Sequence, residues 1–183
     1  MTVMKLIVLE GCDGTGTTTH AEVLAAALCR EGYPGLSYHH PPHPSGCTHW
    51  ERSLHYALER ARICRKLRDT DTVLVADRWY HSTWAYTAVL TREPVRVAML
   101  GLSLYENSIL PPITLAVMLD ASDEVLDARL RERGRETTAD ERTIRNGYRE
   151  YLAGSMESVV DTEAPCDGVG ARLLDLSLAA LRA

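Results

Sequence analysis

Phenylalanine is absent from this sequence, and lysine occurs at two positions only, Lys5 and Lys66. Leucine, valine, alanine, tyrosine and tryptophan must therefore fill the core, and arginine carries nearly all of the positive charge. The five cysteines form no CxxC pair, a pattern that fits reduced thiols in the cytoplasm. The sequence has neither a basic leader nor an apolar run of membrane-spanning length, so we expect no signal peptide and no membrane partner.

The length and charge of the chain narrow the possible classes further. Its 183 residues, 45% of them hydrophobic, are enough for one domain with a full core, and we predict a single domain over 1–183. The net charge of −5 disfavours nonspecific binding to nucleic acid, so we expect no nucleic-acid partner. Any site for an anion must then be a local feature.

The segment 11–18 matches a phosphate-binding loop at all but one position. The pattern is G-x-x-x-x-G-K-[ST], and Gly11, Gly16 and Thr18 match it, whereas Thr17 takes the place of the lysine. An apolar strand-like run precedes the loop and a helical pattern follows it, which is the context the motif requires. The loop predicts that backbone N–H groups hold a phosphate and that the Thr18 hydroxyl serves Mg2+. The alternative is an ordinary glycine- and threonine-rich turn.

Strand-like and helical patterns alternate along the rest of the chain. This order predicts an α/β fold, a parallel sheet with helices on both faces, whose ligands bind at the carboxyl ends of the strands. The predicted strands are 3–9, 35–39, 72–76, 113–119 and 158–160. The predicted helices are 17–31, 48–68, 81–90, 95–107, 122–133, 140–156 and 168–182.

A second candidate site follows the strand 72–76. Asp77 can hold Mg2+, and Arg78 can clamp a phosphate with two parallel hydrogen bonds. Aromatic and hydroxyl side chains follow directly in the segment 79–86, WYHSTWAY, and they suit a flat base beside a phosphate. The alternative is a surface ion pair at the start of a helix.

These motifs together resemble those of thymidylate kinases, which are P-loop nucleoside monophosphate kinases. That family reads F-E-G-x-D-G-x-G-K-T-T-Q at the loop, where this chain has LEGCDGTGTTTH at 9–20. The family's D-R-Y-x-x-S-x-x-A-Y-Q is similar to DRWYHSTWAYT at 77–87, and its L-F-x-A-x-R helix to the segment that contains Tyr56 and Arg60. The later family pattern L-D-x-x-x-E-x-x-x-x-R-x-x-x-R-G meets Leu119–Gly134. The similarity covers nearly the whole chain.

The resemblance implies a P-loop kinase fold with a lid at about 133–142 and transfer of the γ-phosphate of ATP to a deoxynucleoside monophosphate, dTMP to dTDP above all, in nucleotide biosynthesis. It implies Mg2+ as the cofactor, a homodimer, and catalytic roles for Asp13, Arg78, Arg133 and Arg135. The implied ATP-binding residues are Gly11, Cys12, Asp13, Gly14, Thr15, Gly16, Thr17, Thr18, Thr19 and Arg129. The implied acceptor-binding residues are Asp13, Tyr56, Arg60, Arg78, Ser82, Thr83 and Tyr86, with Thr18 and Asp77 at the metal.

Two departures from the family pattern leave the function open. Thr17 brings no charge, and loss of the lysine is worth about 3–5 kcal/mol of transition-state stabilisation unless another residue replaces it. An arginine of the segment 129–142 is the expected substitute, although some of these arginines belong to a solvated helix face. The loop 39–49, HHPPHPSGCTH, lacks the family's R-E-P-G-G-T and changes the acceptor pocket or, as an alternative, holds zinc. The competing hypotheses are therefore a nucleotide-binding protein without turnover and a kinase for a modified nucleotide.

Overall fold

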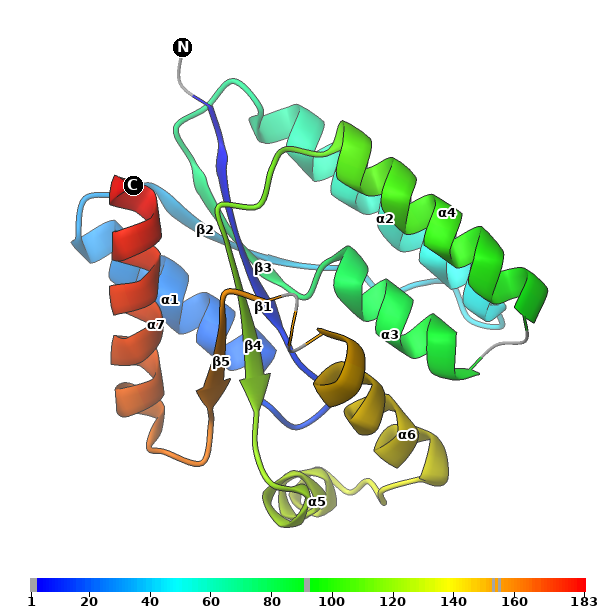
Figure 1. Cartoon of the computed structure of the whole chain (residues 1–183). Coiled ribbons are helices and arrows are strands. Elements are labelled where there is room, and N and C mark those ends of the chain that lie inside the picture. The colour runs from blue at the N-terminus through cyan, green and yellow to red at the C-terminus, as the bar shows by residue number, and fades with distance from the viewer. Residues whose placement is uncertain (1–2, 91–92, 153, 155) are drawn as a thin grey trace.

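The structure is a computed structural model that describes residues 3–90, 93–152, 154 and 156–183. Five strands form one sheet in the order β2-β3-β1-β4-β5 (Figure 1). Every pairing in it is parallel, so the carboxyl ends of all the strands meet at one edge. The strands are β1 (Lys5–Glu10), β2 (Gly35–His39), β3 (Val73–Asp77), β4 (Leu115–Asp120) and β5 (Ser158–Asp161).

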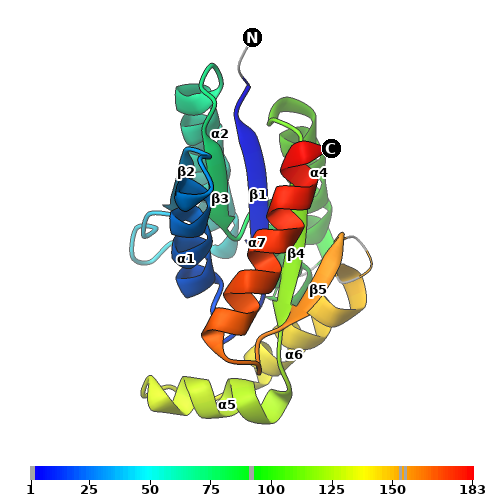
Figure 2. The ribbon, with the colours of Figure 1, turned by 90° about the vertical axis from the view of Figure 1, so that its left-hand side faces the viewer.

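Helices cover both faces of the sheet. One face packs against α1 (Thr17–Arg30) and α7 (Cys166–Arg182), which lie side by side in Figures 1 and 2. The other face carries α2 (His49–Leu67), α3 (Tyr80–Leu90) and α4 (Glu93–Ile109). Beyond the carboxyl ends of the strands lie α5 (Asp123–Glu132), α6 (Ala139–Gly147) and a π-helical turn, η1 (Tyr148–Leu152).

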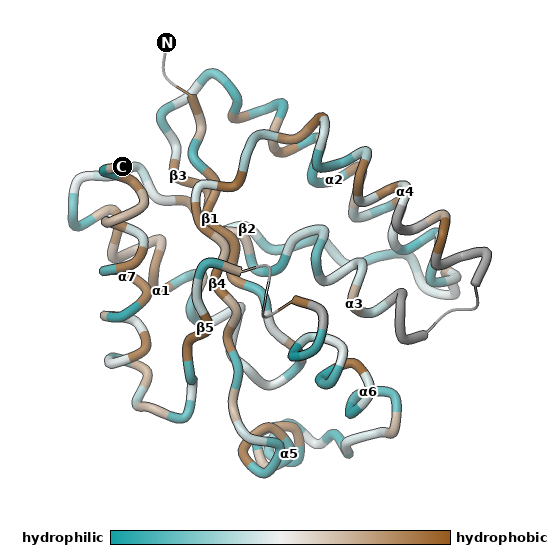
Figure 3. Tube along the Cα trace, viewed as in Figure 1, coloured by the Kyte–Doolittle hydropathy of each residue, from teal (hydrophilic) through white to brown (hydrophobic). Residues whose placement is uncertain are grey.

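The alternating side chains of β1 divide the core into two layers. Ile7 and Leu9 pack on the side of α1 and α7, and Leu6 and Val8 pack on the side of α2. All four are fully buried, and Figure 3 shows the apolar centre of the sheet as a brown band. Because both faces are covered, the strands are almost continuously apolar, as expected for a parallel sheet.

The predicted fold class and all five predicted strands are confirmed, with boundaries that shift by at most two residues. The predicted helix 140–156 is wrong in its second half, because α6 ends at Gly147 and a π-helical turn follows. Tyr148 is buried there and its hydroxyl lies 2.6 Å from Ser82 Oγ on α3, so a tertiary contact overrides the local helical pattern. Residues 153 and 155 of that prediction lie outside the described residues. Among the described helices, none combines the length and the apolar character needed to cross a bilayer.

Candidate functional site

The phosphate-binding loop connects β1 to α1 in a conformation that requires its glycines. Gly14 and Gly16 have positive φ angles of 98° and 86°, which side chains rarely adopt. A Cβ on Gly11 would approach Thr15 Oγ1 to 2.4 Å and the Leu119 carbonyl oxygen to 2.8 Å. No side chain caps the start of α1 at Gly16, and its first turn contains no acidic residue. The helix therefore offers free backbone N–H groups and a positive dipole end to an anion.

Thr18 on α1 and Asp77 at the end of β3 face each other beside this loop. Thr18 Oγ1 donates a hydrogen bond of 2.6 Å to Asp77 Oδ2. Burial alone would raise the pKa of Asp77, but hydrogen bonds from Thr18 and Thr17 outweigh it and lower the pKa. The other oxygen, Oδ1, is buried without a hydrogen-bond partner among the described residues. An ionised carboxylate with one free, buried oxygen beside a hydroxyl is a donor set that suits Mg2+.

Neither lysine of the chain replaces the one missing from the loop. Lys5 lies at the start of β1, where its Nζ donates to the carbonyl oxygen of Leu181 at 2.8 Å. Lys66 is exposed near the end of α2. Thr17 itself is buried, with 4% of its surface exposed. Positive charge beside the loop must therefore come from arginine.

Asp13 of the loop contacts side chains from three parts of the chain: the end of β3, α3 and the segment after α5. Arg78 donates to Asp13 Oδ1 at 2.7 Å, Tyr86 donates to the same oxygen at 3.0 Å, and Arg135 donates to Oδ2 at 2.9 Å. Burial opposes ionisation of Asp13, but the charge and hydrogen bonds of Arg78, together with those of Arg135 and Tyr86, lower its pKa. Arg78 has a left-handed backbone with φ 65°, a strain of about 1–3 kcal/mol that is typical of functional positions.

The predicted lid segment, 133–142, lies against the loop. Arg133 is the C-cap residue of α5. Arg135 forms ion pairs with Asp13 at 2.9 Å and with Glu141 at 2.6 Å. Thr138 and Glu141 form a capping box at the start of α6. The Arg135 side chain is half exposed, so its ion pairs are weak and exchangeable. Arg129 lies apart from these residues and donates to the Gly14 carbonyl and to both oxygens of Thr162, which fixes the loop to the end of β5.

A buried ion pair lies behind the aromatic residues predicted to bind the acceptor. Arg60 on α2 donates to both carboxylate oxygens of Glu106 on α4, at 2.6 and 2.8 Å, and to Thr83 Oγ1 at 3.3 Å. Arg60 and Glu106 are 0% and 2% exposed. Such a pair is held rigidly, and its charge is neutralised within the protein. Arg60 therefore presents hydrogen-bond donors to the site more than a net positive charge.

His40, in the loop after β2, lies among three aromatic rings. Its ring centroid is 4.9 Å from that of Tyr56, 5.2 Å from that of Tyr38 and 6.1 Å from that of Trp79. Burial and the nearby charge of Arg60 lower the pKa of His40 to about 3, so the imidazole is neutral at physiological pH. Its Nε2 is buried without a hydrogen-bond partner among the described residues.

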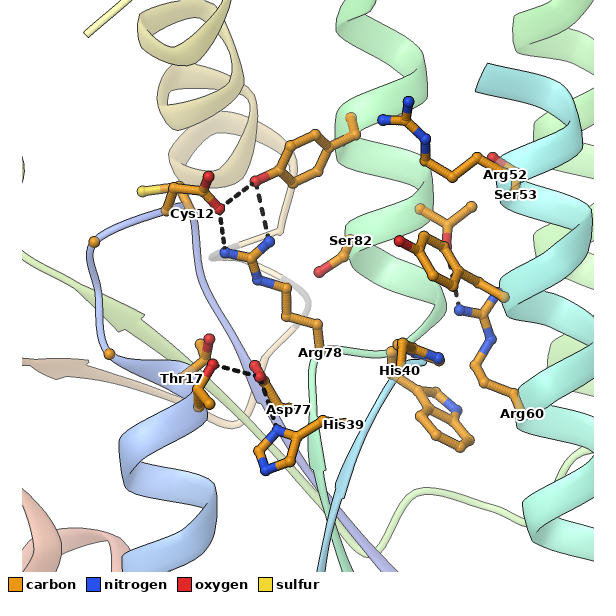
Figure 4. Close-up of a pocket in the computed structure, with 18 of the residues that line it drawn as sticks. Cys12, Thr17, His39, His40, Arg52, Ser53, Arg60, Asp77, Arg78 and Ser82 are labelled. Carbon is orange, nitrogen blue, oxygen red and sulfur yellow. Dashed lines mark hydrogen bonds and ion pairs between the residues drawn. The ribbon is translucent and has the colours of Figure 1, made fainter. Parts of the chain in front are cut away.

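Most of these groups line one cavity of about 400 Å3. The part lined by residues 12–14 and 16–19 of the loop with Arg133 and Arg135 is called the donor half here, and the part between α2 and α3 is called the acceptor half (Figure 4). The cavity brings together most of the predicted site residues, namely Cys12, Asp13, Gly14, Gly16, Thr17, Thr18, Thr19, Tyr56, Arg60, Asp77, Arg78, Ser82, Thr83, Tyr86, Arg133 and Arg135. Gly11, Thr15 and Arg129 support the loop from outside this lining.

Comparisons with known proteins agree with this geometry. No protein-family profile matches the chain. The chain is 27% identical over 169 residues to a "probable thymidylate kinase" of Pyrococcus horikoshii, an alignment that covers 78% of this chain and 80% of the relative. The solved thymidylate kinase of Candida albicans superposes with a TM-score of 0.72 at 17% identity, covering 97% of this chain and 92% of its own. The fold of this chain is that of a thymidylate kinase-like P-loop kinase.

A second solved structure with this thymidylate kinase-like fold has a different acceptor in its name. It is a deoxyadenosine kinase from M. mycoides, with dCMP and dCDP bound as products, and it superposes with a TM-score of 0.71 at 14% identity. The alignment covers 95% of this chain and 99% of that chain. The fold alone therefore leaves the acceptor undetermined.

Sequence reasoning missed several residues of this site. Glu10, fully buried at the end of β1, accepts hydrogen bonds from the backbone of Trp79 at 2.8 Å and from the Ser82 hydroxyl. The Ser82 hydroxyl thus points to Glu10 and Tyr148. A carboxylate directly before the loop, at the end of an apolar strand, was a usable signal for Glu10. The sequence contains no such signal for Glu106, because only the tertiary fold brings Glu106 to Arg60.

The zinc alternative for the loop 39–49 finds no geometric support. His39 Nδ1 lies 3.0 Å from Asp77 Oδ2, and His43 Nδ1 contacts the Pro44 carbonyl at 2.9 Å. Within the described part of the chain, no three histidine, cysteine, aspartate or glutamate side chains group in a way that suits a metal ion. The loop instead contributes His39 and His40 to the wall of the cavity.

Proposed function

We propose that the chain transfers the γ-phosphoryl group of ATP to a deoxynucleoside monophosphate, with dTMP as the first candidate. The observation that carries this proposal is the single cavity that joins a phosphate-binding loop to an aromatic pocket through Asp13 and Arg78. A donor and an acceptor bound in its two halves would meet at these residues. Positioning and charge neutralisation account for most of the catalysis in such reactions.

The donor half suits the phosphates of ATP. The free N–H groups at the start of α1 and the loop backbone would hold them. Thr18 and Asp77 would hold Mg2+, which neutralises phosphate charge when it is bound. Arg133 and Arg135, which line the cavity beside the loop, would supply the positive charge that Thr17 lacks. Arg135 would give up part of its ion pair with Asp13 and bind the phosphoryl group that is being transferred.

The acceptor half suits a nucleotide with an anionic end. Tyr56 would stack on the base, Ser82, Thr83 and Tyr86 would line the pocket, and Arg78 would bind the acceptor phosphate. A phosphate oxygen of the acceptor then attacks Pγ while the bond from Pγ to the bridging oxygen of ADP breaks, so that the acceptor becomes a diphosphate. Arg60, which the resemblance implies to be acceptor-binding, is paired with Glu106 and would offer hydrogen bonds to the base.

A second candidate function is nucleotide binding without turnover. Thr17 favours it, because the cavity lacks a lysine at the position where the loop motif has one. A kinase for a modified nucleotide is a variant of the first proposal, favoured by His39 and His40 in the wall of the cavity where the family pattern has arginine and glutamate. The base of the acceptor separates these possibilities.

The test is ADP release with Mg-ATP and each of dTMP, dUMP, dCMP, dAMP and dGMP. We expect acceptor-dependent ADP with at least one of them, and a loss of about 100- to 1000-fold in Arg78→Ala, since one preorganised charge contact is worth about 3–4 kcal/mol in the transition state. Arg68→Ala is the matched control, because Arg68 is exposed and its one ion pair within the described residues is with Asp69 at 3.5 Å. Binding of nucleotides without ADP release would favour the second candidate.

We also propose that the chain is a cytoplasmic homodimer. All five cysteines are free thiols, as a reducing compartment permits. Large apolar side chains are exposed on α2 and α4, including Leu58 at 69%, Leu104 at 62% and Tyr105 at 61%, and a second copy would cover them. Sedimentation velocity at micromolar concentration tests this, since a monomer would contradict it.

A further inference from the structure

The arginines of the cavity differ in whether a carboxylate already neutralises them. Its lining, as far as the structure describes it, contains five arginines but only two carboxylates, Asp13 and Asp77. Arg78 and Arg135 pair with Asp13, and Arg60 pairs with Glu106 behind the wall. Of the lining arginines, Arg52 and Arg133 alone have no carboxylate partner among the described residues. Arg133 belongs to the donor half, so Arg52 is the one unneutralised arginine of the acceptor half.

The position of Arg52 follows from the first turn of α2. Thr48 and Glu51 form a capping box that starts the helix, and Glu51 Oε2 accepts from both the backbone N–H and the hydroxyl of Thr48. The other carboxylate of the helix, Glu59, pairs with Arg62 at 2.6 Å. Both carboxylates of α2 are therefore occupied, and Arg52 has no partner on its own helix.

Arg52 points into the cavity rather than into solvent. It is half-buried, and its Nε is buried without a hydrogen-bond partner among the described residues. Figure 4 shows its side chain extending from α2 toward α3. Tyr56 lies one turn further along the same face, about 6 Å along the axis. An unpaired, partly desolvated guanidinium costs free energy unless an anion completes it.

We propose that Arg52 binds the phosphate of the acceptor nucleotide, together with Arg78, and so selects a nucleoside monophosphate over a nucleoside. This assignment rests on the proposed function. It divides the work of α2 between three residues on one face: Arg52 binds phosphate, Tyr56 stacks on the base, and Arg60, neutralised by Glu106, donates hydrogen bonds to the base. Arg78 shares its charge with Asp13, so Arg52 supplies the positive charge that a dianionic phosphate still needs.

Calorimetric binding of matched ligand pairs tests the assignment. The ligands are dTMP, dCMP, dAMP and dGMP, each beside its own nucleoside, and the proteins are the wild type, Arg52→Gln and Arg62→Gln. Arg62 is the matched control, because it lies on the same helix but is exposed and paired with Glu59. For the preferred base, we expect Arg52→Gln to raise the Kd of the monophosphate about 10- to 100-fold, equivalent to about 1.4–2.8 kcal/mol.

The nucleoside separates a phosphate contact from a structural role. Its Kd should change less than about twofold in Arg52→Gln, and Arg52→Lys should recover part of the monophosphate affinity. Equal weakening of monophosphate and nucleoside, or no weakening of either, would overturn the assignment while leaving the proposed function in place. A wild-type chain that binds none of the monophosphates would overturn both. The readout is binding, so the assignment is tested whether or not the chain turns ATP over.

Discussion

The donor half of the cavity is built from backbone, whereas the acceptor half is built from side chains that three helices bring together. In the donor half, glycines at fixed spacing let the chain turn at φ angles of 98° and 86° and leave the N–H groups of α1 free. In the acceptor half, the side chains are held in place by pairings such as Arg60 with Glu106, 46 residues apart. The loop keeps its conformation although threonine replaces its lysine, whereas the side-chain positions of the acceptor half depend on the packing of α2, α3 and α4.

Removing the buried carboxylate should have the largest effect on stability. Glu106→Gln leaves the buried Arg60 guanidinium without its counter-charge, and we expect the free energy of unfolding to fall by about 3–5 kcal/mol. Urea denaturation followed by circular dichroism measures it. The double variant Arg60→Met/Glu106→Leu removes both charges and should recover most of the loss. A loss below about 1 kcal/mol in Glu106→Gln would show that solvent or another group neutralises Arg60.

Adding one methyl group at Gly11 breaks the donor half selectively. A Cβ there would meet the Leu119 carbonyl oxygen at 2.8 Å, so Gly11→Ala must displace the loop at a cost of about 1–3 kcal/mol. We expect ATP affinity, measured by calorimetry, to fall together with the melting temperature. Gly101→Ala is the control, because its Cβ on α4 meets no atom within 4 Å; it should stabilise the chain by about 0.5–1 kcal/mol. Unchanged ATP affinity in Gly11→Ala would contradict the role of the loop.

Acid should weaken the acceptor half through His40. The pKa of His40 is about 3 in the fold and about 6.5 in an unfolded chain, so the unfolded state binds more protons between these values. Stability from this residue is complete above about pH 6.5 and is lost as the pH falls toward 3. Between pH 7 and pH 5 the loss amounts to about 2 kcal/mol.

Replacing His40 by phenylalanine should remove this part of the acid sensitivity. The measurement is the free energy of unfolding at pH 7 and pH 5 for the wild type, His40→Phe and His49→Gln, in which an exposed histidine is lost. We expect a flatter dependence in His40→Phe alone. An equal slope in all three proteins would mean that His40 becomes protonated without cost.

The sequence alone predicts the sheet, the loop and the Asp77-Arg78 site, because each depends on a local pattern. Buried parallel strands are apolar runs, and the glycines of the loop stand at a spacing fixed by phosphate geometry. The contacts of Asp13 with Tyr86 and Arg135 were not predictable, since they join segments 73 and 122 residues apart. Tyr148 is similar: its burial against Ser82 ends a helix that the local pattern would continue.

Arg52 shows what a sequence pattern leaves undecided. Its spacing of four residues before Tyr56 and eight before Arg60 places the three on one helix face, which the sequence contains. Whether Arg52 or Arg60 is neutralised by a carboxylate depends on the partners of Glu106, Glu51 and Glu59, and these partners appear only in the folded structure. The role of a charged residue in this cavity is therefore set by which carboxylates are already occupied.

The central claim is that arginines of the lid replace the missing lysine and support phosphoryl transfer. The most direct measurement is acceptor-dependent ADP release at saturating Mg-ATP by the wild type, by Arg133→Gln/Arg135→Gln, and by Arg131→Gln, which removes an exposed arginine of α5 outside the cavity. We predict turnover in the wild type and in Arg131→Gln, and a loss of about 100-fold or more in the double variant. An inactive wild type that gains turnover in Thr17→Lys would contradict the claim.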